Sequence, residues 1–163
     1  MSITFNADEI FEMAEKIEKN AVEFYREAEE KCSNDKEKQM FEKLAQMEND
    51  HAHIFAEMRT ELNPEEMEET VFDPQDEGAM YLQTMASSHG TEGKISPTQK
   101  LTGSESIKEV LEIAVDAEKN SVVFYSGLKE FVPQKAGKDK VQKIIKEELG
   151  HLATLREYLK GHQ

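Results

Sequence analysis

The chain has 163 residues, of which 37% are hydrophobic and 33% charged, a balance typical of one soluble domain rich in amphipathic helix. Its 34 acidic and 20 basic residues give a formal charge of −14, which argues against nucleic acid or an anionic membrane as a partner. The one cysteine, Cys32, excludes an internal disulfide and a four-cysteine metal site. Because no leader sequence and no apolar run of membrane-spanning length is present, we expect a cytoplasmic protein.

The first half of the chain, about residues 7–62, predicts two helices. Residues 7–31 carry apolar side chains at helical spacing and follow Asn6, a suitable N-cap. A second helix is predicted from Asn34, or the residue after it, to near residue 62, before a proline. Since the connection between them is short, the two helices are expected to form an antiparallel hairpin.

The second half, about residues 104–161, predicts another hairpin of the same kind. Ser104 is expected to cap a third helix that Pro133 closes, and a fourth helix is expected over about 136–160. The long segment 63–103 then becomes a crossover that carries a short helix. The sequence therefore predicts an all-α, up-down four-helix bundle that forms a single domain over residues 1–163, with a long crossover between helices two and three.

The two halves repeat each other at an offset of 100 residues. Segments 14–25 and 114–125 share seven of twelve residues, and at the same offset both ends of a Glu-x-x-His motif recur. The two hairpins are therefore expected to be copies of one unit, related by an approximate two-fold axis. Such symmetry suits a site with two equivalent metal ions.

Six residues with metal-binding side chains are predicted to face the core at one level of the bundle. Each hairpin contributes one glutamate from its first helix and a Glu-x-x-His pair from its second, in phase with the apolar stripe. Four carboxylates in a dry interior repel one another, and no Lys or Arg occupies the inward stripes at that level to neutralise them. Two metal ions can do so, and this pattern is the one found in di-iron and di-manganese bundles. The predicted metal ligands are Glu18, Glu48, His51, Glu118, Glu148 and His151.

With these motifs, the chain resembles the ferritin-like bundle of the rubrerythrin family over nearly the whole length of its four helices. The resemblance implies a non-haem di-iron centre, with two iron ions per chain, that reduces hydrogen peroxide or dioxygen. Manganese or zinc could substitute for iron in such a ligand set. The resemblance also implies a homodimer.

Two departures from the family pattern affect this expectation. Rubrerythrins carry a rubredoxin-like iron domain, which needs several cysteines, so electrons are expected to come from an external donor protein, rubredoxin-like or other. Rubrerythrins also have an additional glutamate where this chain has Ser121. The remaining six ligands are closer to the set of bacterioferritin.

Several nearby residues leave alternatives open. Tyr25 and Tyr125 lie seven residues beyond Glu18 and Glu118, so they could donate hydrogen bonds to ligand carboxylates or simply pack in the core. Other titratable residues near the ligands in sequence are interpreted as surface or outer-shell groups, and the histidine close to the C-terminus as exposed. These are Glu15, Asp50, His53, Glu147 and His162.

Three functions remain possible from the sequence. The first is the di-iron oxidoreductase described above, and the second is ferritin-like iron oxidation and storage, which needs a large hollow shell. The third is a metal-free bundle that binds other proteins. Oligomeric size separates the first two, and metal analysis separates both from the third.

Overall fold

A computed structural model describes residues 7–64, 101–132, 134 and 137–162 of the chain. The described part contains four long α-helices and no strand, which confirms the predicted four-helix bundle. None of the described helices is long and apolar enough to cross a membrane. The helices are α1 (Ala7–Lys31), α2 (Asp35–Thr60), α4 (Ile107–Phe131) and α5 (Lys138–Lys160).

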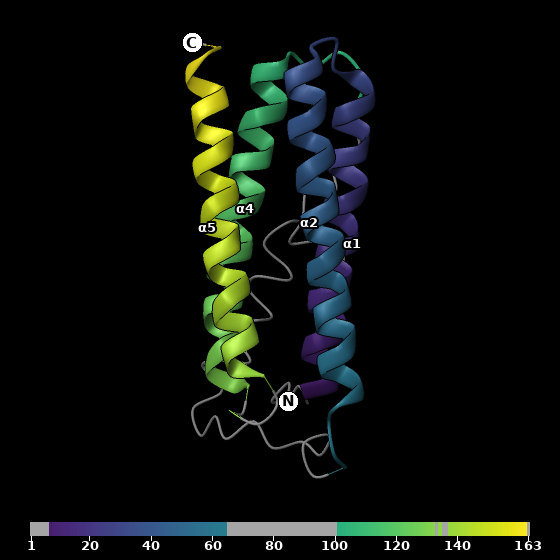
Figure 1. Cartoon of the computed structure of the whole chain (residues 1–163), viewed down its shortest axis with the longest axis vertical. Helices are drawn as coiled ribbons and strands as arrows, with labels where there is room; N and C mark the ends of the chain where they lie inside the picture. Colours follow the sequence, from purple (N-terminus) through teal and green to yellow (C-terminus); the bar gives the residue numbers. More distant parts are fainter. Residues whose placement is uncertain (1–6, 65–100, 133, 135–136, 163) are drawn as a thin grey trace, which may run out of the picture.

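The four helices form two antiparallel hairpins that lie side by side (Figure 1). Helix α1 packs against α2 and α4, and α5 packs against α4 and α2. Across the hairpins, α1 runs antiparallel to α4 and α2 antiparallel to α5 (Figure 1). This arrangement is the approximate two-fold relation that the sequence repeat predicts.

The helix starts agree with the sequence in one hairpin and differ in the other. Asn34 caps α2, and its side chain accepts a hydrogen bond from the Lys36 amide. The prediction that Ser104 caps the third helix is wrong, because α4 starts after Ser106. Ser106 and Glu109 form a reciprocal capping box, which satisfies amide groups at both positions. The predicted Asn6 cap and crossover helix lie outside the described residues.

The start of α5 depends on a glycine. Gly137 precedes the helix with φ of 106°, a left-handed conformation that side chains other than glycine rarely adopt. A Cβ atom at this position would also lie 2.9 Å from the terminal methyl of Met58. The left-handed backbone at this position therefore favours glycine, and a larger residue would also displace the end of the Met58 side chain.

The core consists of two apolar clusters with a polar layer between them. One cluster contains Phe11, Phe55 and Tyr125, and the other contains Phe41 and Leu111. Along each helix, the buried polar residues other than Glu15 and Glu37 lie between its contributions to the two clusters. The bundle thus places charged groups at mid-height and shields them with apolar side chains on both sides.

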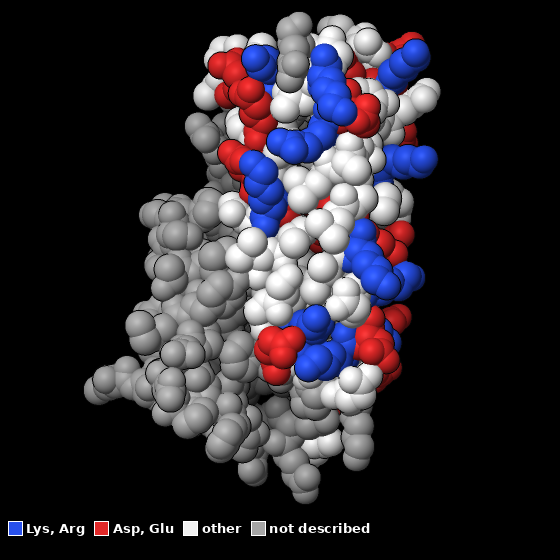
Figure 2. All heavy atoms as spheres, turned by 90° about the vertical axis from the view of Figure 1, so that its left-hand side faces the viewer, with Lys and Arg blue, Asp and Glu red and all other residues white. Residues whose placement is uncertain are grey.

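The outer side of α4 and α5 carries charges of both signs. In the described part of this face, Lys and Arg side chains lie next to Asp and Glu around a band of uncharged atoms (Figure 2). Ion pairs within α4 and within α5 include Lys119 with Asp116 and Lys160 with Glu157. No extended basic field is visible among the residues described on this face (Figure 2).

Candidate metal centre

The six predicted ligand residues meet in the polar layer. Their exposed fractions are 1–3%, so each side chain is removed from solvent. The burial confirms the prediction from helical spacing that all six side chains face the core. The layer is formed by Glu18 of α1, Glu48 and His51 of α2, Glu118 of α4, and Glu148 and His151 of α5.

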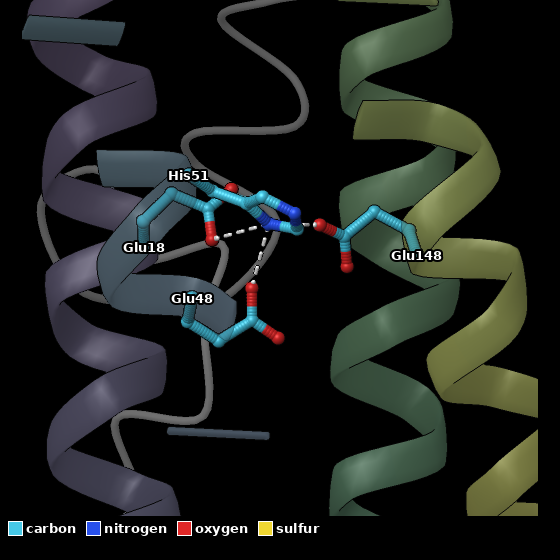
Figure 3. Close-up of side chains that lie close together, drawn as sticks. All are labelled: Glu18, Glu48, His51 and Glu148. Carbon is cyan, nitrogen blue, oxygen red and sulfur yellow. Dashed lines mark hydrogen bonds and ion pairs between the residues drawn. The ribbon is translucent and has the colours of Figure 1, made fainter. Parts of the chain in front are cut away.

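The imidazole of His51 lies within a set of three carboxylates from three helices (Figure 3). Its Nδ1 atom is 3.0 Å from Glu48 Oε2 and 2.9 Å from Glu148 Oε1. The Glu18 Oε2 atom lies 3.7 Å from the same nitrogen. One nitrogen and three carboxylate oxygens therefore surround a common point.

A second set surrounds His151 in the same way. Its Nδ1 atom is 2.9 Å from Glu48 Oε1, 3.4 Å from Glu148 Oε2 and 3.5 Å from Glu118 Oε2. Glu48 and Glu148 belong to both sets, each with one oxygen toward each histidine, and the two imidazole rings stack 5.6 Å apart. The geometry therefore provides two adjacent groups of side chains that could each hold a metal ion, and the two groups share Glu48 and Glu148.

The two tyrosines whose role the sequence left open both reach the polar layer. Tyr25 of α1 donates its hydroxyl hydrogen bond to Glu118 of α4, and Tyr125 of α4 donates to Glu18 of α1. Burial, followed by the charge of the carboxylate each one contacts, raises the pKa of both tyrosines well above the usual value. Both hydroxyls therefore stay protonated as donors, and each ties one hairpin to the other.

Clustering changes the protonation of the acidic groups. Burial, helped by the charge of Glu148, raises the pKa of Glu118 to about 8. Burial and the charges of Glu48 and Glu148 also raise the pKa of Glu18. For Glu148 itself, burial is opposed by hydrogen bonds with Glu118 and both histidines, which leave its pKa below the usual value. Some protons are thus retained at neutral pH when the negative charge has no metal to balance it.

Both histidines gain protons in the same environment. Burial alone would lower the pKa of His51, but its hydrogen bonds with Glu148, Glu18 and Glu48 raise the pKa well above 6.5. The pKa of His151 is raised through equivalent hydrogen bonds to Glu118, Glu148 and Glu48. Binding of a cation between these groups would displace the protons that they hold.

The residues present fit a pair of transition-metal ions. Buried oxygen atoms of Glu48, Glu118 and Glu148 lack a hydrogen bond of good geometry and have only an imidazole Nδ1 atom nearby, at 2.9–3.5 Å. No Lys or Arg is among the buried charged residues described, so the two imidazoles are the only basic side chains within this buried layer. A donor set of carboxylates and imidazoles suits iron, manganese or zinc. The chemistry of the donor set and its buried, clustered carboxylates therefore fit metal binding at this layer.

The structure tests the interpretations of four neighbouring residues. Glu15 forms ion pairs with Arg59 and Lys19, whereas His53 is exposed on α2, as expected. His162 is not exposed as expected, because it is half-buried and its Nε2 lies 2.8 Å from Glu37 Oε1. Glu147 is more than a surface group, because its Oε2 lies 2.8 Å from His51 Nε2. Its position next to Glu148 could not by itself indicate this contact, which depends on how α5 faces α2.

Comparison with known proteins agrees with the geometry. The family model of Rubrerythrin matches residues 9–159 of the chain. A solved structure from Thermotoga maritima, described as a candidate ferritin-like diiron-carboxylate protein, is 27% identical. The match covers 98% of both chains with a TM-score of 0.73. No curated protein sequence matches the chain. The family match spans all four helices and every residue of the polar layer, so this chain belongs to the rubrerythrin family.

Proposed function

We propose that this protein is a non-haem di-iron oxidoreductase that reduces hydrogen peroxide or dioxygen with electrons from an external donor. The observation that carries the proposal is the overlap of two ligand sets through Glu48 and Glu148. A site for one metal would need only one of these sets. Two metals held by common carboxylates lie close enough to act on one small oxidant together.

Each part of the polar layer has a defined task in this proposal. The iron pair, when bound, supplies the two electrons that convert peroxide and two protons into two water molecules. Glu18 and Glu118 bind one metal each, and Tyr125 and Tyr25 hold these carboxylates in place. The two apolar clusters exclude bulk water from the layer on both sides.

An external donor and a homodimer complete the proposal. The sequence holds a single cysteine, so a four-cysteine iron site within these 163 residues cannot supply the electrons. The electrons must therefore come from outside these residues. The proposed donor is a separate redox protein, and the family resemblance favours a dimer as the assembly. Light scattering during size-exclusion chromatography tests the second point.

The test of the proposal combines iron stoichiometry with peroxide consumption. Protein loaded anaerobically with Fe(II) should bind two irons per chain, and each reduced centre should consume one peroxide without further reductant. Near-ultraviolet absorption of the oxidised centre should appear and should bleach when an external reductant is added. The Glu148→Ala variant is the matched control, because it removes a shared ligand. Two bound irons and parental turnover in that variant would refute the assignment.

A second function, iron oxidation coupled to storage, is favoured by Ser121, which is buried beside the layer where rubrerythrins have an additional glutamate. In that case the protein would form a large hollow shell and take up many more than two irons per chain. A small oligomer with iron uptake saturating at two per chain would exclude storage.

A further inference from the structure

The two metal positions differ in the support that their histidines receive. His51 of α2 directs Nδ1 toward the carboxylates of the layer and Nε2 toward Glu147 of α5, 2.8 Å away. The Glu147 side chain is 31% exposed and also pairs with Lys143 at 3.6 Å. The carboxylate thus accepts the Nε2 proton of His51 and leaves Nδ1 available to a metal.

His151 has no equivalent partner. Its Nδ1 faces the layer in the same way, but its buried Nε2 has no hydrogen-bond partner among the described residues. The repeat explains this difference, because the offset of 100 residues places Met47 where the second half has Glu147. A thioether is only a weak acceptor and carries no charge. The nearly two-fold centre is therefore asymmetric at this contact.

A pocket lies next to His151, whose Nε2 has no hydrogen-bond partner among the described residues. It has a volume of about 720 Å³ between α2 and α5 and is lined by Met47 and His151, with Glu147 also at its wall. The unsupported imidazole therefore borders an open space in the bundle. The other imidazole, by contrast, is fixed by a carboxylate across the same helix pair.

From this asymmetry we infer that the two metal positions are inequivalent: the one built on His51 binds its metal more tightly, and the one built on His151 exchanges its metal. The inference rests on the proposed metal centre and assigns Glu147 as a positioning residue. A carboxylate that accepts the second N–H of a ligand histidine fixes the tautomer and ring orientation and makes the ligand more basic. Removing such a partner typically lowers metal affinity by about 10- to 100-fold.

The affinity of each position can be measured separately with Co(II), whose visible absorption reports binding under anaerobic conditions. The His151→Ala variant leaves the position at His51, and the His51→Ala variant leaves the position at His151. We expect the remaining site to bind Co(II) at least about 10-fold more tightly in His151→Ala than in His51→Ala. Equal affinities would overturn the inference.

Exchange of the two repeat-related residues tests the cause. Glu147→Met should lower the Co(II) affinity about 10- to 100-fold in the His151→Ala background and leave it unchanged in the His51→Ala background. Glu147→Gln, which keeps a hydrogen-bond acceptor, should recover part of the loss. Conversely, Met47→Glu should raise the affinity in the His51→Ala background. Equal effects of Glu147→Met in the two backgrounds would show that Glu147 does not act through His51.

A measurement on the protein with all six ligands present guards against variants that fail to fold. A chelator should remove Co(II) from the fully loaded protein in a fast and a slow phase, and Glu147→Met should make the slow phase fast. A single phase in the parent protein would overturn the inference while leaving peroxide reduction possible. Two phases without any peroxide consumption by the iron-loaded protein would instead refute the proposed function alone.

Discussion

Tyr25 of α1 donates its hydrogen bond to Glu118 of α4, on the opposite hairpin, and not to Glu18 on its own helix. Tyr125 makes the reciprocal bond to Glu18. Each tyrosine therefore holds the glutamate that the other half of the repeat contributes to the proposed metal centre. Removing the hydroxyl of a tyrosine on one hairpin should therefore weaken metal binding mainly at the position whose Glu18 or Glu118 ligand lies on the other hairpin.

Tyr25→Phe is expected to lower the metal affinity of the position formed by Glu118 and His151 by about 10-fold or more, because that carboxylate loses the donor that orients it. Tyr125→Phe should act on the other position. Co(II) titration in the single-histidine backgrounds measures each effect. Tyr158→Phe is the control, since that hydroxyl lies 3.5 Å from a backbone carbonyl at the exposed surface. An effect of Tyr25→Phe confined to the Glu18 position would contradict this prediction.

Loss of a shared ligand should differ from loss of a histidine. Glu48→Ala or Glu148→Ala removes an oxygen from both ligand sets, so binding at both metal positions is expected to weaken. His51→Ala or His151→Ala removes a ligand from one set and should leave about one metal per chain. Elemental analysis after anaerobic loading and desalting gives the stoichiometry. The prediction fails if Glu48→Ala and His51→Ala retain the same number of metals.

Metal removal should destabilise the fold, because four buried carboxylates then lose the charge that balances them. A ligand at 100 times its Kd adds about 2.7 kcal/mol of stability, so chelation should lower the Tm by about 5–10 °C for a domain of this size. Differential scanning calorimetry with and without chelator measures the change. In the double variant His51→Ala/His151→Ala, chelator should have little effect. An unchanged Tm after verified removal of metal from the parent would argue against a buried site.

His162 should make the end of α5 sensitive to pH. Its hydrogen bonds to the Tyr158 carbonyl and to Glu37 raise its pKa in the folded protein above 6.5. Since the folded protein binds this proton more tightly than the unfolded chain, the stabilisation is fully present below about pH 6.5 and is lost as pH rises through the folded-state pKa.

The His162→Gln variant should therefore be less stable than the parent at pH 6, by at most about 1 kcal/mol for such a partly exposed pair. The difference should shrink at pH 9. Urea denaturation at both pH values measures it, and His53→Gln, at an exposed position on α2, controls for the loss of an imidazole. A deficit that grows with pH would have the wrong sign for this interaction.

The sequence predicted the ligand layer because helical spacing alone decides which side chains face inward. Glu18 and Glu118 lie in the apolar stripes, and the two Glu-x-x-His pairs keep both members on one face. The sequence also encodes the start of α4, since Ser106 and Glu109 have the spacing of a capping box, which Ser104 two residues earlier does not complete with Ile107.

Contacts across helix pairs were less predictable. The sequence placed Tyr25 near the layer, but which of two glutamates it reaches depends on the rotation and separation of α1 and α4. The contact between Glu147 and His51 likewise depends on how α5 faces α2. Spacing along one helix holds no information on these quantities, which are set by packing between hairpins distant in sequence.

The polar layer also fixes the axial alignment of the four helices. Each helix contributes charged side chains at one level, with apolar residues of the two clusters on either side. Sliding any helix by one turn, about 5.4 Å, would move a carboxylate among aromatic and aliphatic side chains and an apolar residue among carboxylates. Apolar helices of similar composition could pack in several such offsets with comparable energy. In this bundle, the groups that are proposed to bind metal thus favour one alignment of the helices along the bundle axis and disfavour alignments shifted by a turn.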